Sequence, residues 1–304
     1  MSQLPWLMPL QQQLGQLALG GQLHHALLFT GLTGVGKRQL AATLAKQLLC
    51  LQPLATEGCG YCKSCLLVQA GHHPDLLQLT AEHSIGVDAV RELSHFMQSS
   101  PQQGGARVVL LPAAERMTEA ASNALLKTLE EPGQNSFLLL QSAQPQQLLP
   151  TILSRCQQWL VPAVAEHLSR SWLMQQQSGQ VAPQLLDFLQ DYCAGAPLHA
   201  LALLQSGRAD VLWQLVAQLH TYLQRQQGLS ELVKQLEAES EAPQLLHWVI
   251  KQQLLKSMAG QQQLQLFQRL AAWNRDEQVI LGQNKTLAFT ALLLELPRLL
   301  ASRS

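Results

Sequence analysis

The sequence predicts a parallel α/β domain followed by an all-helical second half. Strand-like and helix-like segments alternate up to about residue 160, and a glycine-rich loop joins the first strand to the first helix. From residue 164 onward no strand-like run is found. Strands that alternate with helices indicate a parallel sheet covered by helices. The chain of 304 residues is long enough for two or three domains.

Short apolar runs mark the strands of the first half, and apolar residues at helical spacing mark its helices. Thr118 is expected to cap the helix that it precedes, and Pro132 lies beyond the end of that helix. The predicted strands cover 25–30, 75–79, 107–111 and 136–141, and the predicted helices cover 37–51, 87–99 and 118–130.

Leucine-rich helical stretches separated by glycine make up the second half. We expect domain boundaries near residues 163 and 206, which give an α/β domain at 1–163, a small helical domain at 164–206 and a helical domain at 207–304. The expected helices cover 165–177, 182–194, 198–205, 209–227, 229–238, 243–258, 261–276 and 286–301.

Composition and charge exclude two classes of protein. Lys plus Arg and Asp plus Glu both number 20, so the net charge is zero, and direct DNA binding by the chain alone should be weak or absent. The sequence contains no apolar run of membrane-spanning length and no signal-peptide pattern near its start. We therefore expect a cytoplasmic protein that does not enter a membrane.

A glycine-rich loop follows the first predicted strand and opens the first predicted helix. Its residues Gly31, Gly34, Gly36 and Lys37 fit the pattern G-x-x-x-x-G-K of a phosphate-binding P-loop. In such loops backbone N–H groups surround a phosphate, and the lysine reaches the terminal phosphates. Arg38 stands where hydrolysing P-loop enzymes use Ser or Thr to hold magnesium.

The strand that ends at residue 111 lacks the acidic residues that assist magnesium and water in P-loop enzymes. Pro112 and two alanines follow it, and Glu115 is displaced by three positions. Together with Arg38, this indicates a nucleotide-binding fold that has lost hydrolysis. Lys37 is either a solvated lysine at the start of a helix or part of a residual nucleotide site, so ATP binding by this chain is left open.

Four of the six cysteines lie close together in the sequence, as Cys50-x8-Cys59-x2-Cys62-x2-Cys65. A cytosolic protein gives little reason for disulfides, and four thiolates at this spacing suit tetrahedral zinc in a structural site. An iron–sulfur cluster and a metal-free loop are the alternatives. His72 or His73, which follow shortly, is left open as a substitute ligand.

Three stretches resemble the clamp-loader branch of the AAA+ family. They are SNALLKTLEEP at 122–132, FLLL at 137–140 and ILSRC at 152–156, and the similarity extends over residues 24–156. The resemblance implies an AAA+ P-loop domain with a zinc-binding insertion at 50–65, a helical lid and a helical collar. It also implies a place in a five-subunit ring with the subunits tau/gamma and delta, which loads a sliding clamp onto primed DNA during replication.

The same resemblance implies roles for particular residues. Arg155, within the triplet Ser154-Arg155-Cys156, would be an arginine finger that acts in the ATP site of a neighbouring tau/gamma subunit. Ser142 matches the position of a polar sensor at the end of its strand. The chain would act as a rigid stator with no ATPase or polymerase activity of its own. An active motor subunit of the tau/gamma type, and a zinc-stabilised scaffold in which Arg155 is idle, are the alternatives.

Overall fold

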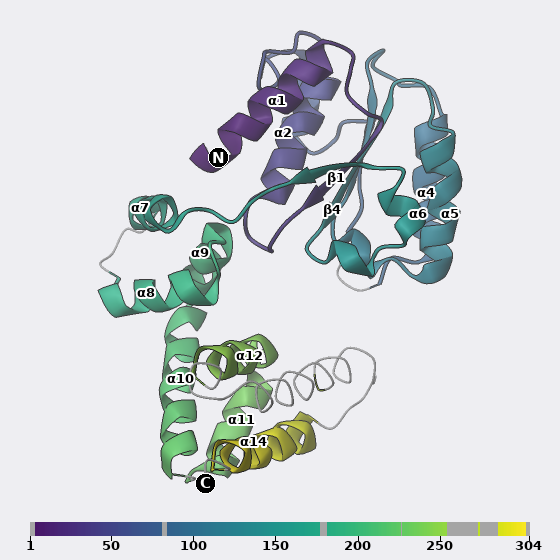
Figure 1. The fold of residues 1–304 in the computed structure, drawn as a ribbon. Coiled ribbons are helices and arrows are strands. Elements are labelled where there is room, and N and C mark those ends of the chain that lie inside the picture. Colours follow the sequence, from purple (N-terminus) through teal and green to yellow (C-terminus); the bar gives the residue numbers. More distant parts are fainter. Residues whose placement is uncertain are drawn as a thin grey trace. The chain divides into compact units, whose positions relative to one another are not determined.

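The computed structural model describes residues 4–80, 84–176, 181–225, 227–253, 273 and 285–301. The chain divides into two compact units. Unit 1 consists of Met1–Gln175 with Ala194–His199, and unit 2 consists of Gln176–Cys193 with Ala200–Ser304. Figure 1 shows their elements, and each unit is described by itself below. The helix expected over 261–276 lies outside the described residues.

Unit 1 contains, within its described residues, a five-stranded parallel sheet in the order β2-β3-β4-β1-β5. Parallel strands covered on both faces are apolar throughout, and β1 and β3 are buried at every position. The four strands expected from the sequence are confirmed. The strands cover β1 Ala26–Thr30, β2 Leu76–Gln78, β3 Arg107–Leu111, β4 Ser136–Ser142 and β5 Gln157–Leu160.

Helices cover both faces of this sheet (Figure 1). Successive side chains of a strand point to opposite faces, so Leu28, Val109 and Leu138 share one face and pack with α4 and α5. On the other face α2 contacts β1, β3 and β4, and α1 packs against α2. These helices are α1 Met8–Leu19, α2 Lys37–Leu49, α4 Val87–Gln98 and α5 Glu119–Glu130.

The predicted cap of α5 is confirmed, because the Thr118 side chain accepts a hydrogen bond from the Ala121 N–H at 3.2 Å. Other short elements complete the unit and were not expected from the sequence. They are the 3-10 helices Pro5–Leu7, Ala114–Arg116 and Pro145–Gln147 and the helices α3 Lys63–Gln69 and α6 Pro150–Leu153.

The last parts of unit 1 are α7, Glu166–Gln176, and the turn at 194–199. The rings of Trp172 and Trp6 meet edge to face, with their centroids 5.2 Å apart. The Val164 N–H donates to the Gly195 carbonyl at 2.8 Å. The hydrogen bond between Val164 and Gly195 ties the segment at 194–199 to the chain just after β5, although some thirty residues separate the two in the sequence.

The described residues of unit 2 form helices only. Phe188 packs between Trp213 and Trp248, with ring centroids 5.3 Å from each, and the Tyr222 hydroxyl donates to the Leu293 carbonyl at 3.0 Å. None of the helices that the structure describes is long and apolar enough to span a membrane. The helices are α8 Pro183–Tyr192, α9 Pro197–Gln205, α10 Arg208–Arg225, α11 Leu229–Ala238, α12 Ala242–Gln253 and α14 Lys285–Ala301.

Candidate functional site

The P-loop lies at the carboxyl edge of the sheet, between β1 and α2. Gly31, Gly34 and Gly36 have φ values of 140°, 87° and 105°, in the region that favours glycine. A Cβ atom on Gly34 would lie 2.6 Å from the backbone nitrogen of His199. The Gly34 carbonyl also accepts a hydrogen bond from the Leu198 N–H at 3.0 Å. The glycine loop therefore packs tightly against the start of α9.

Lys37 is bound to its own loop. Its Nζ donates to the Gly31 carbonyl at 2.6 Å and to the Leu32 carbonyl at 2.8 Å. Burial lowers the pKa of Lys37, and the charge of Glu115 acts in the opposite direction. Lys37 is thus a half-buried group with partners inside the chain. These bonds do not favour the alternative of a fully solvated lysine, and nucleotide binding by Lys37 stays a prediction.

Glu115 reaches the P-loop despite its displaced position in the sequence. It lies in the 3-10 helix that follows β3, and its negative charge partly offsets the lowering of the Lys37 pKa by burial. Its Oε1 accepts a hydrogen bond from the Ala143 N–H at 3.2 Å, whereas its buried Oε2 has no hydrogen-bond partner. A carboxylate is therefore present at this edge, but Arg38, which follows Lys37, offers no magnesium ligand.

Ser142 lies at the same edge, at the end of β4 and in register with Thr30. It is buried, and its Oγ accepts a hydrogen bond from the Gln144 N–H at 3.1 Å. The end of β4 therefore lies beside the end of the strand that precedes the P-loop.

Arg155 lies at the other edge of the sheet. The parallel register pairs Leu27 with Gln157 and Thr30 with Leu160, so the P-loop follows the carboxyl end of β1 while Arg155 precedes the amino end of β5. The strands of the sheet separate the two motifs. Arg155 and the chain's own P-loop therefore lie at opposite ends of these paired strands.

Local contacts hold the guanidinium of Arg155 at the surface. It forms an ion pair with Glu130 at 2.6 Å and donates to the Thr151 carbonyl at 3.1 Å, and 35% of its side chain is exposed. Ser154 donates to the same carbonyl, also at 3.1 Å. Cys156 is buried in the core, where burial raises its pKa to about 12. Within the triplet, the buried side chain of Cys156 therefore lies directly after the partly exposed Arg155.

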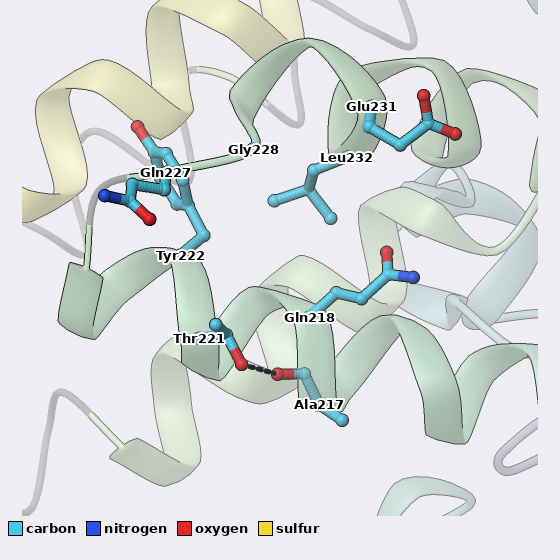
Figure 2. Close-up of a pocket in the computed structure, with 8 residues that line it drawn as sticks. All are labelled: Ala217, Gln218, Thr221, Tyr222, Gln227, Gly228, Glu231 and Leu232. Carbon is cyan, nitrogen blue, oxygen red and sulfur yellow. Dashed lines mark hydrogen bonds between the residues drawn. The ribbon is translucent and has the colours of Figure 1, made fainter.

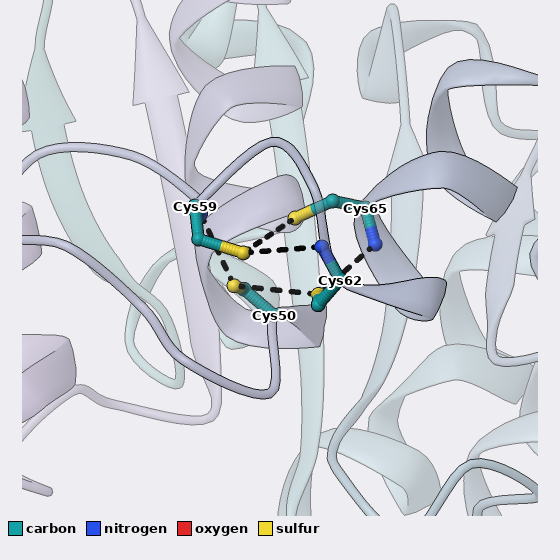
Figure 3. Close-up of side chains that lie close together, drawn as sticks. All are labelled: Cys50, Cys59, Cys62 and Cys65. Carbon is teal, nitrogen blue, oxygen red and sulfur yellow. Dashed lines mark hydrogen bonds between the residues drawn. The ribbon is translucent and has the colours of Figure 1, made fainter.

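The four cysteines predicted as metal ligands converge on one point (Figure 3). All four Sγ atoms of Cys50, Cys59, Cys62 and Cys65 lie within 4.8 Å of one another, with separations of 3.8 Å and 4.0 Å for two pairs. A tetrahedral zinc ion with Zn–S bonds of about 2.3 Å needs sulfur atoms about 3.8 Å apart. The sulfur arrangement therefore fits a single tetrahedral ion.

The chain around these cysteines is built to present the sulfur atoms. Cys50 follows the end of α2, and Cys62 caps α3 by accepting a hydrogen bond from the Cys65 N–H. Burial raises the pKa of Cys62, but backbone N–H groups and neighbouring thiols outweigh it and lower the value to about 6. A Cβ atom on Gly58 would lie 2.9 Å from the Cys65 sulfur, so glycine is needed for the close approach.

Neither histidine after the cysteines joins this cluster. The group of side chains that could hold a metal ion consists of the four cysteines, His72 is exposed, and the Nε2 of buried His73 lies 2.5 Å from the Ser64 hydroxyl. The possibility of a substitute histidine ligand is therefore not supported by the geometry.

A groove of about 320 Å³ lies between α10 and α11 in unit 2 (Figure 2). Within it the Thr221 hydroxyl donates to the Ala217 carbonyl at 2.9 Å. Among the described residues, its lining includes one carboxylate, Glu231. Such a lining offers no pair of groups for acid–base or nucleophilic chemistry. The lining residues are Ala217, Gln218, Thr221, Tyr222, Gln227, Gly228, Glu231 and Leu232.

The parallel sheet, the P-loop after β1 and the helical second half define a protein of the AAA+ class. A family model described as DNA polymerase III, delta subunit, matches residues 8–165. The chain is 40% identical to DNA polymerase III subunit delta' of Yersinia pestis, over 98% of this chain and 87% of the relative. The chain belongs to the delta' family of DNA polymerase III subunits.

A second relative agrees with this assignment, and a solved structure supports the fold alone. DNA polymerase III subunit delta' of Escherichia coli is 38% identical over 81% of this chain and 73% of the relative. A solved structure of a DNA polymerase III gamma subunit-related protein from Thermotoga maritima superposes with a TM-score of 0.52 at 20% identity. It covers 94% of this chain and all of the other, and it supports the fold.

Tau subunits are also similar to this chain, over a smaller share of their length. The chain is 34% identical to DNA polymerase III subunit tau of Escherichia coli over 73% of its own residues, which is 36% of that relative. The homologues support a role as a clamp-loader subunit.

Proposed function

We propose that this clamp-loader subunit does not hydrolyse ATP and supplies Arg155 to an ATP molecule held by a neighbouring tau/gamma subunit. The observation that carries the proposal is the placement of Arg155 at the sheet edge opposite the chain's own P-loop. An arginine in that position acts on a nucleotide only if another chain brings it there. A cation placed in this way stabilises the charge that develops on the transferred phosphoryl group.

The surroundings of Arg155 suit such a role. Its ion-pair partner Glu130 is half exposed, so water screens the attraction and a phosphate can replace the carboxylate at small cost. Cys156, the residue after Arg155, is buried in the core, and this limits the motion of the backbone at Arg155. Ser154 contributes a hydrogen bond to the same short turn.

The test is the ATPase activity of the reconstituted clamp loader, stimulated by clamp and primed DNA, with wild-type chain or Arg155→Ala. An arginine finger contributes a factor of about 10³ to 10⁵ at its own ATP site. Total turnover should therefore fall at least by the fraction that the neighbouring ATP site contributes. Arg155→Lys should restore only part of the lost turnover. Unchanged turnover in a fully assembled complex would leave the chain as a scaffold.

Arg91→Ala is the matched control. Arg91 also pairs with a single exposed carboxylate, Asp88 at 3.0 Å, but it lies on α4 and is not part of the triplet. Gel filtration of each reconstituted complex separates a loss of catalysis from a loss of assembly. Turnover that falls equally in both variants would point to a general effect of surface charge.

A residual motor activity is the second candidate, and Glu115 is the observation that favours it. Within the described residues its buried Oε2 has no hydrogen-bond partner, and its charge acts on the pKa of Lys37 at an edge where P-loop enzymes use a carboxylate. Against it stand Arg38 at the magnesium position and the bonds of Lys37 to its own loop. ATP turnover by the isolated chain, lost on Glu115→Gln, would establish the motor.

The four-cysteine cluster completes the proposal as a structural zinc site. Four thiolates leave no coordination position for water, so the ion would hold the segment at 50–65 together and take no part in the chemistry. The remaining expectations belong to the same proposal. They are the division into AAA+ domain, lid and collar, the role of stator in a five-subunit ring with tau/gamma and delta, and contact with clamp and primed DNA through the assembled complex.

A further inference from the structure

A chain of buried polar groups connects the cysteine segment to the edge of the sheet. Ser64, His73 and Asp75 are all buried. The Ser64 hydroxyl donates to the Leu49 carbonyl at 2.5 Å and lies 2.5 Å from the His73 Nε2, and the Asp75 N–H donates to the His73 Nδ1 at 3.0 Å. Three hydrogen bonds thus run in series from the start of β2 to the end of α2.

The direction of these bonds is fixed by what each group can do. A backbone N–H only donates, so the His73 Nδ1 must accept from Asp75 and the ring proton must be on Nε2. A carbonyl only accepts, so the single proton of Ser64 points to Leu49 and its oxygen must accept from His73. The neutral ring with its proton on Nε2 is therefore the form that satisfies all three bonds. Burial, which lowers the pKa of His73, favours that neutral form.

One end of this series of hydrogen bonds lies beside the cysteines, and the other end is anchored at the sheet. Leu49 ends α2 directly before Cys50, and Ser64 lies in the first turn of α3, between Cys62 and Cys65. At the other end, the Asp75 carboxylate accepts hydrogen bonds from two backbone N–H groups, of Gln102 and Gln103, at 2.7 Å and 2.8 Å. The same carboxylate lies 3.7 Å from the Arg107 guanidinium on β3.

We propose that His73 is a positioning residue for the four-cysteine metal site. By holding Ser64 against Leu49, it keeps the end of α2 and the start of α3 at the spacing at which the sulfur atoms converge. This inference rests on the proposal that the cluster binds zinc. Groups that orient metal ligands without touching the metal contribute factors of about 10 to 100 in metal affinity.

Two substitutions separate the two bonds of His73. In His73→Gln the side-chain N–H₂ occupies the place of Nε2 and can still donate to Ser64. His73→Asn can accept from Asp75 but is too short to reach Ser64. We expect zinc affinity in the full-length chain, measured by competition with a chromogenic chelator, to fall about 10- to 100-fold in His73→Asn and to change less than about 3-fold in His73→Gln.

Ser64→Ala should weaken zinc binding as His73→Asn does, because it breaks the same connection from the other side. His72→Asn is the matched control, since His72 is the exposed neighbour of His73 and should leave zinc affinity unchanged. A purely structural role for His73 would lower the melting temperatures of the metal-free and zinc-loaded protein equally and leave zinc affinity unchanged. Unchanged affinity in His73→Asn would therefore overturn the proposal.

The absorption spectrum of the Co²⁺-substituted chain reports the coordination geometry of the four sulfur atoms independently of affinity. The thiolate-to-cobalt absorption of His73→Gln should match wild type, and that of His73→Asn should be shifted or reduced at saturating Co²⁺. Equal spectra and equal affinities for the Gln and Asn variants would overturn the assigned role of the Ser64 bond. A wild-type chain that binds neither Zn²⁺ nor Co²⁺ would overturn the zinc site itself, whereas tight binding by wild type and His73→Asn alike would overturn only the role of His73.

Discussion

Replacing Gly34 by alanine tests the contact between the P-loop and the start of α9. Gly34 has a φ of 87°, and its carbonyl accepts a hydrogen bond from the Leu198 N–H at 3.0 Å. An added Cβ atom would lie 2.6 Å from the nitrogen and from the Cβ of His199. The methyl group therefore cannot fit unless the loop and the turn at 194–199 move apart.

Three effects add up in Gly34→Ala. The left-handed backbone costs an alanine about 1 kcal/mol. The hydrogen bond from Leu198 contributes about 1 kcal/mol, and overpacking against backbone adds about 1 to 3 kcal/mol. We expect the free energy of unfolding of unit 1 to fall by about 3 to 5 kcal/mol.

Gly104→Ala is the matched control, because Gly104 has a φ of 73° and no atom within 4 Å of the position of an added Cβ. It should cost only the backbone term, about 1 kcal/mol. Urea unfolding followed by circular dichroism compares the two variants, and hydrogen exchange reports the Leu198 amide directly. Equal destabilisation by both substitutions, with Leu198 exchange unchanged in Gly34→Ala, would refute the reasoning.

Three further outcomes are expected. Asp75→Ala should cost about 3 to 5 kcal/mol in urea unfolding, because it leaves the buried Arg107 charge unpaired, whereas Asp88→Ala, which breaks an exposed pair, should change little. Burial lowers the pKa of His25 below 6.5, so its contribution to stability is complete above pH 6.5 and is lost as the pH falls through the lower folded-state value. His25→Gln, which can still donate to the Leu129 carbonyl, should therefore flatten the loss of stability between pH 7 and pH 5, and an unchanged profile would contradict this. Cys65→Ser should lower bound zinc, measured by elemental analysis, from one ion per chain toward none, and full retention would count against the site.

The central strands could be predicted because their chemistry is local. β3 and β4 each contain an uninterrupted apolar core, at 108–111 and 137–140, as is typical of strands buried on both faces, and their predicted bounds agree within one residue. β5 escaped prediction because an edge strand shows no such pattern. Its sequence is Gln-Gln-Trp-Leu, and most of its side chains are exposed. α3 was missed because Cys62, which was interpreted as a ligand in a loop, also caps a helix.

The candidate sites divide in the same way. Cysteine spacing is local, so the sequence was sufficient to predict a cluster whose sulfur atoms then converge in the structure. The hydrogen bond between Leu198 and Gly34 joins residues far apart in the sequence and needs the whole fold of unit 1. Glu115 was set aside because it is three positions out of place, yet in the 3-10 helix after β3 it binds the Ala143 N–H beyond β4, and its charge acts on Lys37. Such contacts leave no periodic signal in a sequence.

If Arg155 acts on a neighbour's phosphate as proposed, interaction energies favour it over Lys37 for that role. Lys37 donates two short hydrogen bonds to carbonyls of its own loop, and bonds from charged donors contribute about 1.5 to 3 kcal/mol each. A phosphate must replace both before Lys37 gains anything. The ion pair of Arg155 with Glu130 is partly exposed, and exposed pairs contribute at most about 1 kcal/mol. The guanidinium also donates one hydrogen bond to the Thr151 carbonyl at 3.1 Å, against the two carbonyl bonds of Lys37. A neighbouring nucleotide therefore competes against a weak partner at one edge of the sheet and against strong ones at the other, and Glu130→Gln should leave the stimulated ATPase of the assembled loader unchanged while Arg155→Ala lowers it.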